Sequence, residues 1–396
     1  MHDHQALIVT AFLILVFGLV SKLSEKSPIT APMFFLAAGI LFSFIGLFDV
    51  HVEMGLIKTL AELTLIIILF VDASLIKFDK LGQALSGIPT RLLAIGLPLT
   101  MILGSVIGSL LFPHWSIWLI VLIALILSPT DAALGQAVIK SEKVPKNIRD
   151  SVSIESGLND GIALPPILVC IAALSAPDGM LPEGGNWFNY LFLQLTLGPL
   201  IGALIGWGGG KAIEFASKRD WMAPTFQQLS SVSLAIVAFA FAELFHGNGF
   251  ISAFFAGLIL AVQTKDIRHR IQEFGEAEGQ LFSLSIFFLL GLVAVPTFFP
   301  YWNMQTFIYA LLSLTLIRML PVFLSLQGTQ LSTSKKLFVG WFGPRGIASV
   351  LYLLIVIAEL GSTGYEEALS VVVLTVILST FLHGISATFL TNKISR

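Results

Sequence analysis

Cysteine and charge are both scarce in this 396-residue chain. Cys170 is its single cysteine, so an intrachain disulfide is excluded. Charged residues make up 12% of the sequence, whereas a typical soluble domain carries about 25%. Hydrophobic residues reach 56%, and the mean hydropathy is +0.90. These values indicate an all-α polytopic membrane protein.

Other absences narrow the function. The sequence has no basic tract for binding nucleic acid, no glycine-rich phosphate loop, no Cys/His metal-ligand spacing and no nucleophile elbow. We therefore expect no enzyme activity, no nucleic-acid partner and no resident cofactor. A sensor would carry a soluble output domain, and no connection between the apolar segments is long enough to fold as one.

Apolar stretches of about 17–25 residues mark membrane spans, because a hydrocarbon core of about 30 Å needs about 20 helical residues. We predict thirteen spans in one membrane domain covering residues 1–396. They are residues 5–22, 31–48, 55–76, 89–111, 115–139, 148–175, 187–215, 226–245, 248–263, 278–297, 304–326, 336–359 and 367–391. The first could be a signal sequence, but no small-residue cleavage site follows it, so a membrane helix is the preferred interpretation.

The basic residues predict the orientation, because Lys and Arg concentrate in cytoplasmic loops. With the N-terminus outside and the C-terminus inside, 19 of the 22 basic residues fall on the cytoplasmic side. Lys58 alone falls outside, while Arg318 and Arg345 fall within spans. We expect an integral protein of a bacterial inner membrane with its N-terminus outside.

Two spans are interrupted at matching places. The fifth contains Ser-Pro-Thr-Asp at 128–131, and the twelfth contains Gly-Pro-Arg-Gly at 343–346. Proline breaks or kinks a helix, and irregular backbone within a membrane persists only where protein or a cavity surrounds it. Two such spans in corresponding halves indicate an inverted-repeat transporter with crossed, broken helices. Asp131 and Arg345 each follow a break, so we favour a structural role for both charges.

Polar residues on the sixth span point to ion chemistry. Glu155 and Asn159 are four residues apart, as are Ser156 and Asp160, so the two pairs form adjacent stripes on one helix. Asp160 lies near mid-depth, where a carboxylate is either protonated or paired with a cation. Ser156 and the freed carbonyl near Thr130 supply further oxygen ligands for a hard cation. A carboxylate held by structural hydrogen bonds is the alternative, and it suits Glu155 better than Asp160.

Other polar residues in the spans are assigned less directly. Asp72 shapes an inner funnel or reaches the interface, and Glu62 and Glu243 are interface or outer-vestibule acids. Arg318 pairs with an acid that the sequence does not identify. His383 titrates near neutrality or is a packed histidine.

These segments resemble the NhaP-like cation/proton antiporters, the group that includes animal sodium/proton exchangers. The resemblance covers essentially the whole chain and is carried by residues 128–131, 155–161, 340–346 and 383–387. The most specific part is Asn159 followed by Asp160, because the electrogenic relatives have two aspartates there. The resemblance therefore implies electroneutral exchange of one cation for one proton. The chain ends soon after its last span, so we expect no cytoplasmic regulatory domain.

The resemblance also implies an architecture. It implies a homodimer in which a core bundle, residues 89–175 and 304–391, moves in an elevator-like manner. The bundle would move against a dimerisation bundle, residues 5–76 and 187–297.

By position, the resemblance makes Asp160 the carrier of cation and proton. It makes the Thr130 carbonyl and Ser156 co-ligands and Asn159 a supporting residue. A second set, Asp131, Glu155 and Arg345, would form a structural ion-bridge at the crossing. Asp72 matches an acid on the third span that is commonly glutamate in the family.

Together these observations predict a secondary antiporter that exchanges Na⁺ for H⁺ by alternating access, with both ions competing for Asp160. Li⁺ and K⁺ are further candidate cations, and a K⁺/H⁺ antiporter of the same fold is the first alternative. A cation channel is the alternative of a different class. A channel needs a continuous polar pore, whereas the ionisable groups here cluster at one depth.

Overall fold

The computed structural model describes residues 2–24, 27, 29–46, 54–75, 87–131, 134–139, 141–175, 187–263 and 268–394. Within these residues the chain forms helices and no β-strand. The helices are α1 (His2–Ser24), α2 (Ala31–Ile45), α3 (Met54–Leu75), α5 (Ile88–Arg91), η2 (Leu92–Gly96), α6 (Leu97–Leu111), α7 (Ile117–Ile126), α8 (Gln136–Ile139), α9 (Lys146–Ser175), α10 (Trp187–Lys218), α11 (Pro224–Leu244), α12 (Gly249–Gln263), α13 (Arg268–Leu289), η3 (Leu290–Ala294), α14 (Val295–Phe298), η4 (Phe299–Tyr301), α15 (Met304–Leu314), α16 (Leu316–Ser325), α17 (Thr333–Trp341), α18 (Ile347–Leu360) and α19 (Glu366–Ile394).

Each of the thirteen predicted spans coincides with one helix or with consecutive helices, which confirms the predicted fold class. Seven helical segments in the described residues are long and apolar enough to cross a membrane, and five shorter helices are also apolar. The fifth and twelfth spans are broken as predicted, into α7 and α8 and into α17 and α18. The eleventh was predicted as a single span, and within it Thr315, with φ −112° and ψ −94°, separates α15 from α16.

The chain divides into two compact units. The first contains Met1–Thr59, Gly87–Ser156 and Ser283–Arg396, and the second contains Leu60–Ser86 and Gly157–Phe282. Helix α9 continues from the first unit into the second without interruption. The division into a core bundle and a dimerisation bundle concerns which parts move, and it stays a prediction.

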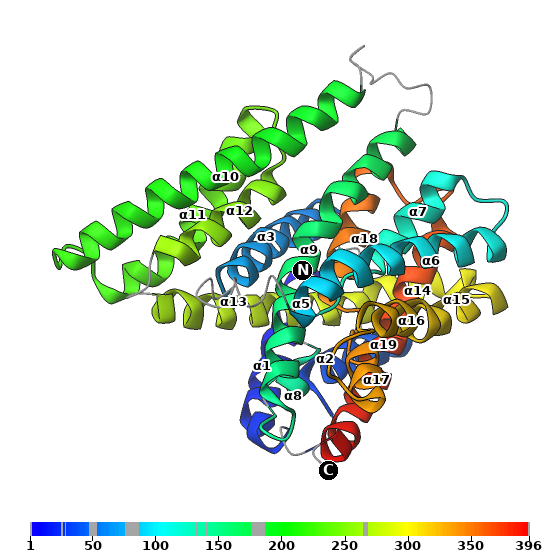
Figure 1. Cartoon of the computed structure of the whole chain (residues 1–396). Helices are drawn as coiled ribbons and strands as arrows, with labels where there is room; N and C mark the ends of the chain where they lie inside the picture. The colour runs from blue at the N-terminus through cyan, green and yellow to red at the C-terminus, as the bar shows by residue number, and fades with distance from the viewer. Residues whose placement is uncertain are drawn as a thin grey trace. The chain divides into compact units, whose positions relative to one another are not determined.

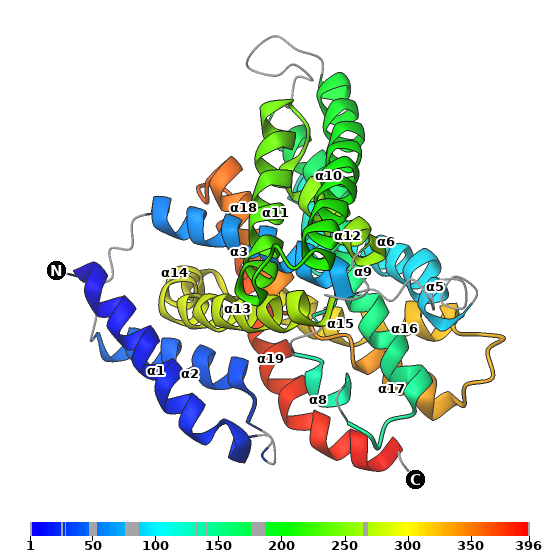
Figure 2. The same ribbon diagram turned by 90° about the vertical axis from the view of Figure 1, so that its left-hand side faces the viewer.

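In the first unit, α1 and α2 run side by side (Figure 2). Buried apolar side chains from α9, α16, α17 and α19 pack together near one end of α19. They are Val144, Ile148 and Val152 before and along α9, Val322 and Leu326 at α16, Phe338, Val339 and Phe342 at α17, and Ala387 on α19. This packing holds the end of α17, which leads into the second break.

In the second unit, α10, α11 and α12 lie side by side (Figure 1). Helices α10 and α12 approach closely because Gly202 and Gly206, one turn apart on α10, face the α12 backbone. A Cβ at Gly202 would overlap the carbonyl oxygen of Ser252, and one at Gly206 would overlap that of Ala256. Small residues at this spacing let membrane helices pack backbone to backbone.

Candidate ion-binding site

The first break follows from the sequence at 127–131. Helix α7 ends at Ile126, and the chain then passes through Pro129, which has no backbone N–H to continue the helix. The Ser128 hydroxyl donates back to the Ala124 carbonyl at 2.6 Å. On α18, the Ser349 hydroxyl donates to the Ile126 carbonyl at 2.8 Å, so side chains satisfy carbonyls at the end of α7.

The second break separates α17, which ends at Trp341, from α18, which begins at Ile347. It contacts the first break directly, since the Asp131 N–H donates to the Pro344 carbonyl at 2.9 Å. One oxygen of the Asp131 carboxylate accepts the Ile347 N–H at 2.6 Å. Position 346 has to be glycine here, because a Cβ would overlap that carboxylate. Asp131 therefore caps the N-terminus of α18, where a negative charge is favourable.

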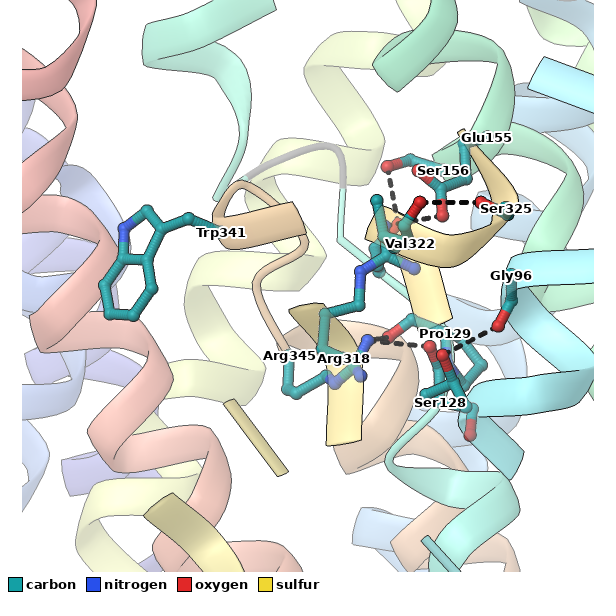
Figure 3. A network of polar contacts seen from close by, with 12 residues as sticks. Gly96, Ser128, Pro129, Glu155, Ser156, Arg318, Val322, Ser325, Trp341 and Arg345 are labelled. Atoms are coloured by element: carbon teal, nitrogen blue, oxygen red, sulfur yellow. Dashed lines mark hydrogen bonds and ion pairs between the residues drawn. The ribbon is translucent and has the colours of Figure 1, made fainter. Parts of the chain in front are cut away.

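Arg345 performs the reciprocal role. One terminal nitrogen of its guanidinium donates to the Ser128 carbonyl at 2.7 Å and to the Pro129 carbonyl at 3.0 Å (Figure 3). A positive charge is thus placed at the carbonyl end of α7, the favourable end for a cation. Both side chains are buried, with Arg345 0% and Asp131 5% exposed. The interrupted helices therefore meet as predicted, and each break is held by a charge from the other.

Glu155 and Arg318 form a buried ion pair beside this crossing. The Arg318 guanidinium lies 2.6 Å from a Glu155 carboxylate oxygen, and each side chain is 1% exposed. Arg318 is supplied by α16 and Glu155 by α9. The sequence showed that Arg318 needed an acidic partner but did not identify Glu155. The only signal was an arginine alone in an apolar span.

Two of the residues predicted to supply ligands come together. Thr130, next to the first break, and Ser156, on α9, are buried with their hydroxyl oxygens 3.0 Å apart. One turn after Ser156, the same helix carries Asn159 and Asp160, which are 0% and 5% exposed. The roles of these four residues in binding stay predictions.

The remaining acids differ in their surroundings. Asp72 and Glu62, both on α3, are partly exposed, and their assignments stay predictions. Glu243 accepts the Gly249 N–H at 2.8 Å, so it caps the N-terminus of α12. Sequence reasoning placed Glu243 at an interface and missed this contact.

The sequence matches the family described as "Sodium/hydrogen exchanger, transmembrane" over residues 8–393. It is 25% identical over 388 residues to a K(+)/H(+) antiporter NhaP2 from Shewanella baltica (strain OS223), covering 96% of this chain and 65% of that protein. It is 28% identical over 243 residues to the Na(+)/H(+) antiporter 2 of Zygosaccharomyces rouxii, covering 57% of this chain and 29% of that protein. The chain thus spans 65% of the length of the NhaP2 relative.

The fold is also similar to a solved structure. The sodium proton antiporter MjNhaP1 from Methanocaldococcus jannaschii superposes with a TM-score of 0.81 at 19% sequence identity, with complete coverage of both chains. At this identity the likeness shows the fold.

Proposed function

Because this chain belongs to the family of transmembrane sodium/hydrogen exchangers, we propose that it is a secondary antiporter that exchanges Na⁺ for H⁺. The observation that carries the proposal is the buried polar turn of α9. It places the side chains of Ser156, Asn159 and Asp160, each at most 5% exposed, within a membrane-spanning helix. A carboxylate at such a place persists where it serves ions or protons.

The proposed mechanism is competition at Asp160. Its carboxylate holds either a proton or a monovalent cation, and both neutralise its charge, so only the occupied site crosses the membrane at low energetic cost. Ser156 and the Thr130 carbonyl contribute oxygen ligands, and Asn159 supports them. The cation is a substrate of the transporter. Oxygen ligands suit such a hard ion.

The scaffold has a separate proposed role. Asp131, Glu155 and Arg345, joined by Arg318, hold the two breaks in place while the core bundle moves. Asp72 lies on the inner approach. We further propose 1:1 electroneutral exchange, an elevator-like motion, a homodimer, and a bacterial inner membrane with the N-terminus outside.

A K⁺/H⁺ antiporter is the second candidate. It is favoured by the similarity to K(+)/H(+) antiporters of the NhaP2 type, which extends over 96% of this chain. Selection between Na⁺ and K⁺ depends on cavity size and ligand number, so the substrate has to be measured.

The test is proton flux in proteoliposomes after addition of Na⁺, K⁺ or Li⁺. We expect the wild-type protein to release protons on addition of Na⁺, at a rate that an imposed membrane potential leaves unchanged. Asp160→Asn cannot ionise, so it should lose this flux and still reach the membrane folded.

Asp150→Asn is the matched control, because it changes an acid nearer the start of the same helix and should keep its flux. Normal flux from Asp160→Asn would remove Asp160 as the carrier. Cation current without proton movement would favour a channel.

A further inference from the structure

The second break leaves backbone groups without a helical partner. Helix α19 supplies partners at both ends of this break. At one end, the Arg345 N–H donates to the Ser379 hydroxyl oxygen at 2.7 Å. At the other, Nε2 of His383 lies 2.9 Å from the Trp341 carbonyl. Ser379 and His383 are one turn apart on a continuous helix. A rigid element therefore spans the break from side to side.

The contacts of the His383 ring restrict where its protons lie. A carbonyl only accepts, so Nε2 of His383 has to carry the hydrogen that points to Trp341. The other ring nitrogen, Nδ1, lies 2.9 Å from the Ser379 carbonyl and 3.2 Å from the Ser379 hydroxyl. Nδ1 can donate to the Ser379 carbonyl only if the ring is doubly protonated. In the neutral ring with its hydrogen on Nε2, Nδ1 instead accepts from the Ser379 hydroxyl, which also accepts from the Arg345 N–H.

Burial and a neighbouring positive charge favour the neutral imidazole over the doubly protonated one. His383 is 2% exposed, and Ser379 connects it to the backbone N–H of Arg345, whose side chain is already a fully buried cation. A second proton on the ring would add another buried positive charge without an acid bonded to it in the contacts above.

Trp341 restrains the same ring from one side. The indole stacks on the His383 imidazole, with ring centroids 4.8 Å apart and an interplanar angle of 29°. Its Nε1 donates to the Ser386 hydroxyl of α19 at 2.9 Å. Figure 3 shows the Trp341 indole turned away from the Arg345 network. The end of α17 is therefore attached to α19 through both its backbone and its side chain.

We propose that His383, as the neutral Nε2–H tautomer, and Ser379 are positioning residues for transport. They fix the second break and therefore Arg345, whose guanidinium holds the carbonyls of Ser128 and Pro129. Thr130, the predicted cation ligand, is the next residue along the chain. The effect on cation binding rests on the proposed function. The tautomer of His383 and the attachment of the second break to α19 do not.

The transport test compares variants at one position. His383→Leu removes both ring bonds, and we expect the half-saturating cation concentration to rise about tenfold, as for the loss of residues that orient metal ligands. The maximal rate should stay within about twofold. His383→Gln keeps an N–H that can reach the Trp341 carbonyl, so it should restore most of the affinity. The pH at half-maximal flux should be the same for His383→Gln and the wild-type protein.

Ser379 and its neighbour provide a second comparison. Ser379→Ala should raise the half-saturating concentration as His383→Leu does, and the double variant should be no worse than the single ones, because both residues belong to one chain of bonds. Thr380→Val is the matched control. Its hydroxyl is buried on α19 but bonds only to the Val376 carbonyl of its own helix, so we expect wild-type affinity.

The protonation of the ring can be read without transport. Nitrogen-15 NMR of histidine-labelled protein, with His383→Gln to assign the signal, should show the neutral Nε2–H tautomer from pH 5 to pH 8. A signal that titrates in this range would overturn the proposal. So would wild-type affinity in both His383→Leu and Ser379→Ala, or a shifted pH profile in His383→Gln. Absence of cation-coupled flux from the wild-type protein would instead contradict the proposed function, and the NMR result would still decide the tautomer.

Discussion

At position 155 the chain buries a carboxylate, and at position 318 it buries the guanidinium that neutralises it. The two side chains are 2.6 Å apart and each is 1% exposed. Removing two charges from water is costly, and their attraction offsets that cost only while both are present. The pair is thus better understood as a matched set than as a source of net stability.

The first prediction concerns this pair. Arg318→Met leaves the Glu155 carboxylate buried without its cation, so we expect a loss of about 3–5 kcal/mol in the free energy of unfolding. Adding Glu155→Gln to that variant removes the orphaned charge and should restore a substantial part of the loss. Thermal unfolding in detergent measures both effects.

An exposed ion pair of this chain serves as the control. Lys218 and Glu214 are 2.7 Å apart on α10, with side chains 62% and 30% exposed. Lys218→Met should change stability by less than about 1 kcal/mol, because exposed pairs contribute little. Equal losses in the single and double variants at positions 155 and 318 would contradict the account given for the buried pair.

At the scale of elements, the two broken spans exchange their terminal groups. The carboxylate after the first break accepts the N–H of Ile347, and the guanidinium after the second donates to Ser128 and Pro129. Helix ends in a membrane have no water to satisfy them, so irregular backbone needs protein partners at that depth. The charges therefore make the breaks possible, and the breaks bring freed carbonyls next to Thr130.

Elsewhere the elements are held by close backbone contact, and α10 offers a matched comparison. A Cβ at Gly202 would overlap the Ser252 carbonyl of α12, whereas one at Gly208 would meet nothing within 4 Å. We expect Gly202→Ala to separate the two helices and to destabilise the protein by about 1–3 kcal/mol. Gly208→Ala should be neutral or slightly stabilising, because alanine favours helix. Unfolding midpoints of the two variants decide this, and equal midpoints would argue against close packing of α10 on α12.

At the scale of the whole molecule, much of the fold followed from the sequence. The length of each apolar run identifies it as a span, and counting these runs gives the number of spans. Pro129 and Pro344 marked the two breaks. Both signals are local in the sequence. Thirteen predicted spans accordingly coincide with helices. Helix periodicity also placed Ser156 and Asp160 on one stripe of α9.

What the sequence did not give depends on how distant helices are rotated against each other. Arg318 and Glu155 are far apart in the chain, and their pairing requires the angular position of both α16 and α9. The contact between His383 and Trp341 was missed for the same reason. It depends on how α19 is rotated, and α19 is almost uniformly apolar around its polar groups. The eleventh span divides at Thr315, six residues before its proline, Pro321, so that proline did not mark the position of the division.

Orientation is the property of the whole molecule that the basic residues predict, and two exposed connections test it. Thr363, between α18 and α19, should face outside, and Glu142, between α8 and α9, should face the cytoplasm. In a Cys170→Ala background, each position is changed to cysteine and treated with a membrane-impermeant maleimide. We expect the cysteine at 363 to react in intact cells and the one at 142 to react only after permeabilisation. The Cys170→Ala protein without an added cysteine is the unlabelled control. Cys170 is only 2% exposed. The reverse pattern would place the N-terminus inside, and labelling of both positions in intact cells would show that the span count between them is wrong.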